Sequence, residues 1–349
     1  MTNECNINSL VRETVKNLKP YSSARDEYTA TSNDMVFLDA NENPYQNGVN
    51  RYPDPQQHDV KTQLSKLKGV STEHILLGNG SDEILDLIFR VFCEPNQDEI
   101  ITLPPTYGMY SVLADINAIN NIKVNLEPGF QPNTTEILRV ANAHTKLLFL
   151  CSPNNPTANS FDAERIKELV SNFKGIVVVD EAYIDFSNTD SWISKLNDHP
   201  NLIVTQTLSK AYGMAGIRLG VCYASKAIIS ILNRIKPPYN VNTLTQSKAL
   251  ERLSKPEAIS QEVQHILEQR DWLVAQLQTI NFIDIVYPSD ANFVLVKVDD
   301  ANKRYTQLIQ KDIVVRNRST QVHCENCLRF TVGSQIENIK LITALRQLT

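Results

Sequence analysis

Two side chains suited to chemistry follow short apolar segments of the sequence. Asp180 ends the apolar run 176–179, and Lys210 lies three residues after the run 202–207. A carboxylate at the end of a buried strand is costly unless a positive group meets it. A lysine in a closed site near other cations loses its proton readily, which suits it to bonding with an aldehyde. Taken alone, Lys210 would be interpreted as a solvated surface charge.

Neighbouring residues could bind a phosphate. The segment 78–82 (Gly-Asn-Gly-Ser-Asp) leaves an apolar run and opens a helical pattern. Its glycines let backbone N–H groups approach an anion, which a helix N-terminus also favours. Arg218, eight residues after Lys210, offers a fork of donors, and Thr207 and Ser209 add hydroxyl groups. The lysine, the carboxylate and this phosphate cup together predict pyridoxal phosphate, an electron sink when its pyridine nitrogen stays protonated.

Two further polar segments follow predicted strands. Asn155 comes after the run 147–151 and, with Tyr183, could hydrogen-bond the phenolic oxygen of such a cofactor. Tyr107 comes after the run 99–103 and could stack on the cofactor ring. Alone, Asn155 fits a turn and Tyr107 fits an apolar core. Their shared position at strand ends favours the cofactor site, because ligands of parallel sheets bind beyond the carboxyl ends of the strands.

Apolar, β-branched runs alternate with helical patterns between about residues 75 and 235. The expected strands are 74–77, 99–103, 123–126, 147–151, 176–180, 202–207 and 219–223. Most are separated by helical segments such as 82–92 and 163–172, which predicts an α/β fold with a mostly parallel sheet covered by helices on both faces. No helix separates the last two strands, which allows an antiparallel pair.

A segment with consecutive prolines, 234–240, marks an expected domain border. Beyond it, Pro256 opens a long amphipathic helix. After that helix we expect a strand at 293–298, a helix at 302–310, strands at 313–316 and 328–332, and a final helix. The predicted parts are an N-terminal arm over 1–35 that packs with the small domain, a large cofactor-binding domain over 36–236 and a small α+β domain over 237–349.

The composition is that of an ordinary globular protein and argues against several classes. Of 349 residues, 42% are hydrophobic and 21% charged, with a net charge of −5. No basic block suggests nucleic acid or an anionic membrane as a partner. No apolar run approaches the ~20 residues that span a bilayer, and the first residues lack the apolar core of a secretion signal. We therefore expect a cytoplasmic protein with reduced thiols.

The pair Cys324 and Cys327, beside His323, has a spacing found in redox and metal motifs. It precedes an alternating strand pattern, however, and no second pair of this spacing occurs in the chain. We interpret both cysteines as ordinary thiols and assign no metal ligands.

The sequence resembles the fold-type-I pyridoxal-phosphate aminotransferases over nearly its whole length. The motifs that carry the resemblance are GNGSDE (78–83), PPTYGMY (104–110), SPNNPT (152–157), DEAY (180–183), TLSKAYGMAGIRLG (207–220) and LRFTVG (328–333). Within this family, NLKPYSSAR (17–25), DANENPY (39–45) and RYPDPQ (51–56) are similar to the subgroup that acts on histidinol phosphate.

This resemblance implies a role for each matching residue. Lys210 carries the cofactor as a Schiff base and moves a proton, and Asp180 pairs with the pyridinium nitrogen. Tyr183 and Asn155 hold the phenolic oxygen, and Tyr107 stacks on the ring. The implied phosphate contacts are Ser81, Asp82, Thr207, Ser209 and Arg218, with Tyr52 reaching across from the neighbouring subunit of a homodimer. The implied substrate pocket consists of Arg329, which grips a carboxylate, together with Arg316, Tyr21 and Asn43.

One position departs from the family pattern. Where the family usually has glycine after Asn-Pro-Thr, this chain has Ala158. If the position needs a positive φ, alanine costs about 1 kcal/mol or more there, with a slight shift of Asn155 as the expected result.

The reaction implied by the resemblance moves an amino group reversibly from glutamate to imidazole acetol phosphate, giving 2-oxoglutarate and L-histidinol phosphate. Arg316 and Arg329 could receive both the carboxylate and the phosphate, because guanidinium forks suit both anions. An aromatic or broad-specificity aminotransferase and a phosphoamino-acid decarboxylase remain open alternatives on the same fold. A ligand-sensing regulator is a further alternative, but the first ~35 residues hold neither a helix-turn-helix nor a basic cluster.

Overall fold

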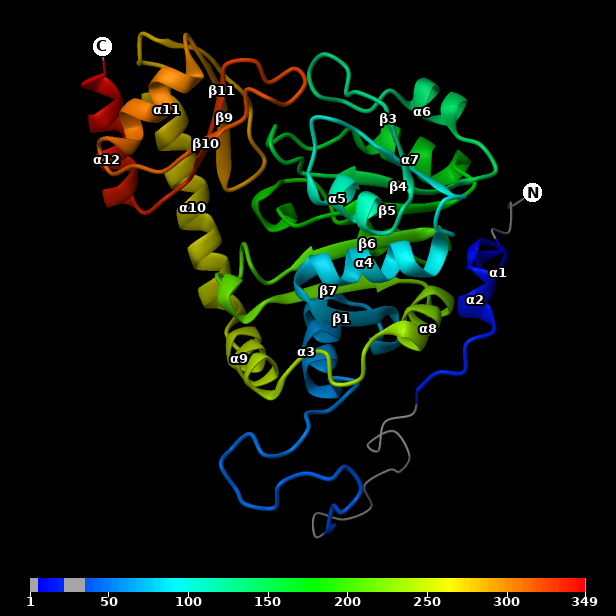
Figure 1. The fold of residues 1–349 in the computed structure, drawn as a ribbon. Coiled ribbons are helices and arrows are strands. Elements are labelled where there is room, and N and C mark those ends of the chain that lie inside the picture. The colour runs from blue at the N-terminus through cyan, green and yellow to red at the C-terminus, as the bar shows by residue number, and fades with distance from the viewer. Residues whose placement is uncertain (1–5, 22–34, 349) are drawn as a thin grey trace.

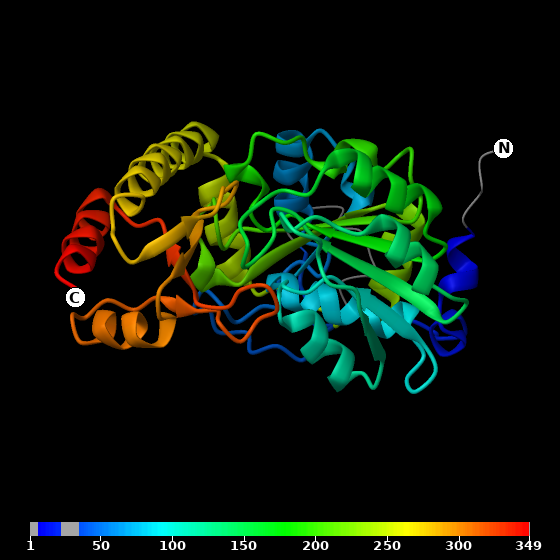
Figure 2. The same ribbon diagram turned by 90° about the horizontal axis from the view of Figure 1, so that it is seen from above.

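The computed structural model describes residues 6–21 and 35–348 of the chain. A large sheet carries helices on both faces, and a domain built on a smaller sheet lies beside it (Figure 1). Viewed from above, the two sheets lie side by side, with the C-terminal helix at the outer edge of the smaller domain (Figure 2). The predicted fold class is confirmed by this arrangement.

The large sheet has seven strands in the order β1-β7-β6-β5-β4-β2-β3. Strand β7 runs antiparallel to both of its neighbours, and the remaining pairs are parallel. The strands are β1 (Ile75–Asn79), β2 (Glu99–Thr102), β3 (Asn120–Lys123), β4 (Thr145–Cys151), β5 (Ile176–Asp180), β6 (Leu202–Thr207) and β7 (Leu219–Ala224).

Each face of this sheet contributes to its own apolar core. Along β5, Val177 and Val179 belong to one core, and Ile176 and Val178 to the other, because successive side chains of a strand point to opposite faces. The helices are α3 (His58–Lys68), α4 (Gly80–Phe92), α5 (Met109–Ile116), α6 (Thr134–Val140), α7 (Ala163–Asn172), α8 (Lys226–Ile235) and α9 (Thr243–Leu253). Burial on both faces explains why the central strands are continuous apolar runs.

The smaller sheet is antiparallel, in the order β10-β11-β9-β8. Its strands are β8 (Ile283–Val286), β9 (Phe293–Val298), β10 (Arg316–Asn317) and β11 (Cys327–Thr331), and its helices are α10 (Pro256–Leu277), α11 (Ala301–Ile309) and α12 (Gln335–Arg346). In the described part of the chain, no helix is both long and apolar enough to cross a membrane.

Helix α10 joins the two parts of the molecule. Ile259, near its start, packs in a core of the large sheet, whereas Leu273 and Leu277 pack in the core of the small domain. Ile266, midway along the helix, contacts both. Helix α10 therefore contributes to both cores, and Phe293 and Leu295 of β9 also pack in the core of the large sheet.

Most predicted elements lie where the sequence pattern placed them, and three differ. Strand β3 begins and ends three residues before the predicted 123–126, and β10 covers 316–317 instead of 313–316. Strand β8 was not predicted, because its four residues are only partly buried or exposed and show no apolar run. The differences fall at sheet edges, where burial leaves the weakest sequence pattern.

The N-terminal arm does not lie where we expected. Ile7, Val11 and Val15, in and beside α1 (Ile7–Leu10) and α2 (Glu13–Lys16), pack in the same core as α4 and α8 of the large sheet. Arg12 adds an ion pair with Glu94, 3.1 Å between Nε and Oε2. Figure 1 shows this arm on the side away from the small domain. The predicted packing with the small domain is therefore corrected for residues 6–16, and residues 22–34 of the arm lie outside the described part.

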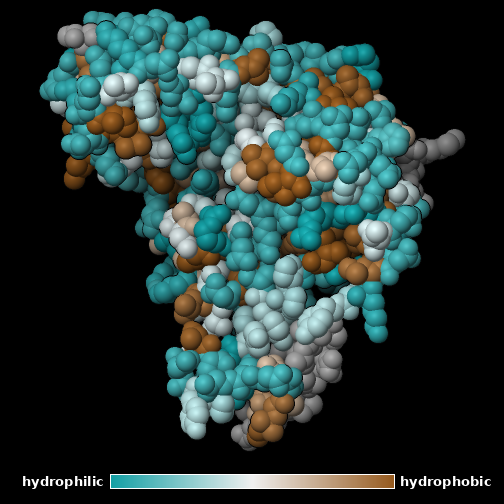
Figure 3. Space-filling view, viewed as in Figure 1, coloured by the Kyte–Doolittle hydropathy of each residue, from teal (hydrophilic) through white to brown (hydrophobic). Residues whose placement is uncertain are grey.

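An extended segment, residues 35–53, protrudes from the large domain (Figure 1). It exposes several large apolar side chains, among them Val36, Tyr45 and Leu38, the last 90% exposed. Apolar atoms are visible on this protrusion at the bottom of the space-filling view (Figure 3). Such a segment has apolar surface that its own chain leaves uncovered.

Candidate active site

A cavity of about 100 Å³ lies at the carboxyl ends of β4, β5 and β6. Its lining residues are Ser81, Asp82, Tyr107, Cys151, Asn155, Asp180, Ala182, Tyr183, Thr207, Ser209, Lys210 and Arg218. All but Cys151 and Ala182 were predicted from the sequence to bind the cofactor. They converge because the carboxyl ends of neighbouring parallel strands meet at one edge of a sheet.

Lys210 is positioned by the short connection between β6 and β7. Its carbonyl accepts a hydrogen bond from the backbone N–H of Gly213 at 3.0 Å. The Nζ atom lies 5.5 Å from the ring centre of Tyr183. Burial lowers the pKa of Lys210, and the nearby charge of Arg329 lowers it further, whereas Asp180 raises it. A lowered pKa increases the fraction of the amine that is neutral and nucleophilic.

Asp180 is the last residue of β5, and only 3% of it is exposed. Its Oδ2 accepts a hydrogen bond from the hydroxyl of Tyr110 at 2.7 Å, and its Oδ1 accepts one from the N–H of Ala182 at 3.2 Å. Both donors are neutral, and burial raises the pKa of Asp180. A protonated pyridine nitrogen placed here would supply the positive charge that favours the ionised carboxylate, so this residue fits the predicted cofactor.

Tyr110 is a functional contact that the sequence analysis missed. The residue is fully buried and stacks on Phe149, with ring centres 4.8 Å apart. Its position three residues after Tyr107, in the first turn of α5, is also typical of a core aromatic. The missed signal was that a buried tyrosine hydroxyl needs a hydrogen-bond partner, and Asp180 is the partner it finds.

The phosphate cup forms where the start of α4 meets the residue before β7. Gly80 has a φ of +71°, and its N–H donates to the carbonyl of Arg218 at 2.8 Å. A Cβ at Gly80 would lie 2.5 Å from Nη2 of Arg218, which would have to move, and the positive φ further disfavours a side chain. The guanidinium of Arg218 is 3.5 Å from both Asp82 Oδ2 and Ser209 Oγ. Thr207 Oγ1 donates to Ser209 Oγ at 3.0 Å. This cradle of hydroxyl and guanidinium groups fits a phosphate.

Tyr107 and Asn155 lie on the rim of the same cavity. The hydroxyl of Tyr107 donates to Asp82 Oδ1 at 3.1 Å, and burial raises the pKa of Tyr107. Asn155 accepts a hydrogen bond from Nη1 of Arg329, which lies on β11 of the small domain. The side chain of Asn155 therefore connects the two domains across the opening of the cavity.

Arginines from the small domain face this opening. Arg316 on β10 is paired in register with Arg329 on β11. The guanidinium of Arg329 lies 4.9 Å from the ring centre of Phe293. Burial and the neighbouring charges of Arg318 and Arg316 lower the pKa of Arg329 to about 10. Arg318 was not singled out in the sequence, because the strand pattern was expected to end at residue 316.

Three predicted site residues lie apart from the cavity in the single chain. Tyr52 is 51% exposed and stacks on Tyr239, with ring centres 4.5 Å apart. Tyr21 is 75% exposed, and Asn43 is also exposed on the protruding segment. Within the described residues, 6–21 and 35–348, none of the three lines the cavity.

Ala158 has the backbone conformation that the sequence analysis anticipated. Its φ is +69°, it is fully buried, and its N–H donates to the carbonyl of Asn154 at 2.7 Å. This left-handed conformation costs a non-glycine residue about 1–2 kcal/mol. The strain lies three residues from Asn155, at the edge of the cavity.

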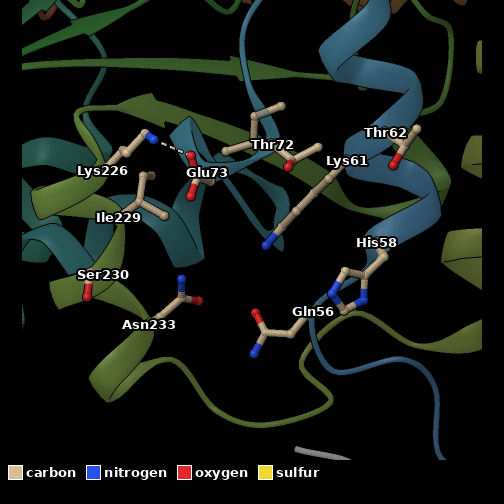
Figure 4. Close-up of a pocket in the computed structure, with 11 residues that line it drawn as sticks. Gln56, His58, Lys61, Thr62, Thr72, Glu73, Lys226, Ile229, Ser230 and Asn233 are labelled. Carbon is tan, nitrogen blue, oxygen red and sulfur yellow. Dashed lines mark ion pairs between the residues drawn. The ribbon is translucent and has the colours of Figure 1, made fainter. Parts of the chain in front are cut away.

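A second, larger cavity of about 560 Å³ lies between α3 and α8. Lys61 projects into it, with Gln56, His58 and Asn233 around the same space (Figure 4). Lys61 is only 7% exposed, and burial, followed by the charge of Lys236, lowers its pKa to about 8.

The chain resembles known proteins in sequence and in structure. The sequence pattern of the family described as aminotransferase class I and II matches residues 28–345. The chain is 61% identical over 347 residues to a histidinol-phosphate aminotransferase of Flavobacterium johnsoniae, with 99% of each chain covered.

Solved structures share the fold. A histidinol-phosphate aminotransferase from Clostridium acetobutylicum superposes with a TM-score of 0.79 at 23% identity, over 85% of this chain and 90% of that one. One from Sinorhizobium meliloti, in complex with pyridoxal 5'-phosphate, gives a TM-score of 0.78 at 24% identity, over 85% of this chain and 82% of that one.

Proposed function

This chain belongs to the aminotransferase class I and II family, and from that premise we propose that it transfers an amino group reversibly between L-histidinol phosphate and 2-oxoglutarate. The observation that carries the proposal is the convergence of Lys210, Asp180 and the phosphate cradle on one cavity, in a chain 61% identical to a histidinol-phosphate aminotransferase. The cofactor is pyridoxal phosphate, which when bound supplies an aldehyde for the amino group and an electron sink for the adjacent carbon.

Each cavity residue has a proposed task toward that cofactor. Lys210 would hold the cofactor through its aldehyde and would carry the substrate proton on its amine, for which a lowered pKa suits it. Asp180, held by Tyr110, keeps the pyridine nitrogen protonated. Tyr183 and Asn155 hold the phenolic oxygen. Tyr107 stacks on the ring, and the phosphate is held by Ser81, Asp82, Thr207, Ser209 and Arg218.

We propose that arginines of the small domain bind the substrate. We assign the amino-acid carboxylate to Arg329, whose planar fork suits bidentate binding. Arg316, opposite it in register, contributes to anion binding in the other half-reaction. Because both come from the small domain while Lys210 comes from the large one, we expect closure on binding.

We propose that the protein acts as a homodimer with composite sites. The protruding segment that carries Asn43 and Tyr52 supports this, since several of its apolar side chains are exposed in the described part of the chain. Tyr52 would then reach the cofactor phosphate of the partner. Sedimentation should show a dimer, and a fully active monomer would refute the assignment.

We propose that the protein is cytoplasmic. Its other partners would be small molecules, and we expect neither nucleic acid nor membrane among them. Support comes from the thiols, since Cys93, Cys151, Cys222, Cys324 and Cys327 are all free and buried.

The experiment that tests the substrate is a kinetic comparison. With 2-oxoglutarate as acceptor, kcat/KM should be highest for L-histidinol phosphate, compared with phenylalanine, tyrosine and threonine phosphate. A higher value for an aromatic amino acid would favour the broad-specificity alternative. Release of carbon dioxide from threonine phosphate would favour the decarboxylase.

A further inference from the structure

Arg318 is an arginine to which the proposed function gives no role so far. It follows β10 directly, and its backbone N–H donates to the carbonyl of Cys327 on β11 at 2.8 Å. It thus continues the pairing that sets Arg316 opposite Arg329. Residues two apart along an extended strand point to the same face, so Arg316 and Arg318 project to the same side of the small sheet.

The side chain of Arg318 lies within electrostatic reach of Tyr183, a residue that lines the active-site cavity. Burial lowers its pKa, as does the charge of Arg316, whereas Cys324 and Tyr183 raise it. Tyr183 lines the cavity together with Lys210. After burial, Arg318 is also the strongest influence that lowers the pKa of Arg329. Together with the strand register, these mutual effects indicate that the three guanidinium groups lie within electrostatic reach of one another and that Arg318 and Arg329 act on Tyr183.

Like charges that lie close together and are partly buried repel one another, and an anion among them would lower that cost. The Nε atoms of Arg318 and Arg329 are buried and find no hydrogen-bond acceptor among residues 6–21 and 35–348. A buried donor left without an acceptor costs about 1–3 kcal/mol, and more when it is charged. The acceptors that are missing within the chain are therefore expected from a ligand.

The two substrates place different demands on this cluster. A carboxylate carries one charge and is satisfied by one guanidinium fork. A phosphate monoester carries about −1.5 to −2 charges at pH 7 and three strong acceptor oxygens. Arg329 is already fixed by its hydrogen bond to Asn155, near Lys210, where the reacting carbon and its carboxylate must lie.

We propose that Arg318 is a third anion-binding residue of the substrate pocket, which acts with Arg316 on the phosphate of the phosphate-ester substrate, while Arg329 receives the carboxylate in the other half-reaction. This assignment rests on the proposed function and deepens it. Arg318 thereby determines specificity between phosphorylated and unphosphorylated amines.

Arg318→Met tests the assignment, because methionine is apolar and unbranched and removes both charge and donors. In single-turnover reactions of the holoenzyme, kcat/KM for L-histidinol phosphate should fall about 10- to 100-fold, mainly through KM. The value for glutamate should change by less than about threefold. L-Histidinol, which lacks the phosphate, should be equally insensitive. Similar losses for all three substrates, or no loss for any, would overturn the proposal.

Arg346→Met is the matched control. Arg346 lies on the exposed side of α12 in the same domain and donates to Gln276 at 2.7 Å. The same substitution there should leave both half-reactions unchanged.

Inorganic phosphate provides a readout that does not depend on turnover of histidinol phosphate. By occupying Arg316 and Arg318 beside Arg329, phosphate should inhibit the glutamate half-reaction, and Arg318→Met should raise its inhibition constant at least about tenfold. If Arg318→Met shows this shift but the wild type does not turn over histidinol phosphate, the proposed substrate is wrong and the role of Arg318 stands. An equal inhibition constant in both proteins contradicts the role of Arg318.

Discussion

Lys210 and Lys61 lie in different cavities on the large domain, and burial lowers the pKa of both. For Lys61 the pKa falls to about 8, and its cavity, about 560 Å³, is larger than the cavity of about 100 Å³ around Lys210. Judged by pKa and space alone, Lys61 would be the stronger candidate for a reactive amine.

The groups around the two lysines differ. Lys210 faces Asp180 and Tyr183, which end or follow a parallel strand. Lys61 projects from a helix, and the charges that act on it are Lys236 and Asp54. Lys210 differs from Lys61 because the edge of a sheet places a carboxylate, an aromatic ring and a phosphate cradle around it.

Among the substitutions that test this difference, Lys210→Ala should have the largest effect on activity. Transamination should fall by on the order of 10⁴-fold or more, because the nucleophile and the proton carrier are lost together. The cofactor should still bind through its phosphate. Borohydride should fix the cofactor on Lys210 of the wild type, as peptide mapping would show. Lys61→Met should keep activity within about twofold of wild type, and labelling of Lys61 would reverse our assignment.

Asp180→Asn should have the next largest effect. It keeps the shape and the hydrogen bond to Tyr110 but removes the charge, so kcat should fall at least about 10²- to 10³-fold. Tyr110→Phe keeps the charge and removes one donor, and a loss of about tenfold is expected. Half-reaction kinetics measure both. If Asp180→Asn retained near wild-type turnover, Asp180 would have some other role.

Lys61→Met should change stability instead of activity. The folded-state pKa of Lys61, about 8, lies below its ordinary value of 10.5, so the unfolded chain holds this proton more tightly. At pH 7 the substitution should therefore raise the free energy of unfolding by up to about 3 kcal/mol. The gain should shrink as the pH rises from about 8 towards 10.5. Urea unfolding at several pH values measures it, and a gain independent of pH would argue against a buried charge.

Ala158→Gly should have the smallest effect, near the Lys210 cavity. Release of the positive φ should raise the free energy of unfolding by about 1 kcal/mol. Ala118, which is exposed and has a φ of +54°, offers a matched control far from the site. Ala118→Gly should give a similar gain, whereas only Ala158→Gly should alter substrate affinity through Asn155. A loss of stability at Ala158 would show that its methyl group packs too well to remove.

The sequence predicted the cavity well because its residues are tied to strand ends. Asp180 and Asn155 follow apolar runs whose parallel pairing decides where their side chains meet. Tyr110 was not predicted, because its position in a helix fits a core residue as well as a site residue. Arg318 was missed because it lies beyond a two-residue edge strand with little apolar pattern.

Other features depend on surfaces that a linear pattern does not describe. Ile7, Val11 and Val15 indicate an apolar face, but nothing in their spacing tells which domain it covers. The contact that we propose for Tyr52 depends on a second chain. The sequence thus predicted the features whose geometry is decided by strand pairing. It did not predict which surface of the molecule an apolar face packs against.

Helix α10 also bears on how the protein unfolds. At 22 residues it is about 33 Å long, and Ile266 at its middle touches both cores. If the small domain unfolded, Leu273 would lose its packing contacts. The helix would then fray towards Ile259, which packs in the core of the large sheet. The two domains therefore share their cooperativity. Calorimetry should record one heat-absorption peak, with the small domain acting as part of a single folding unit.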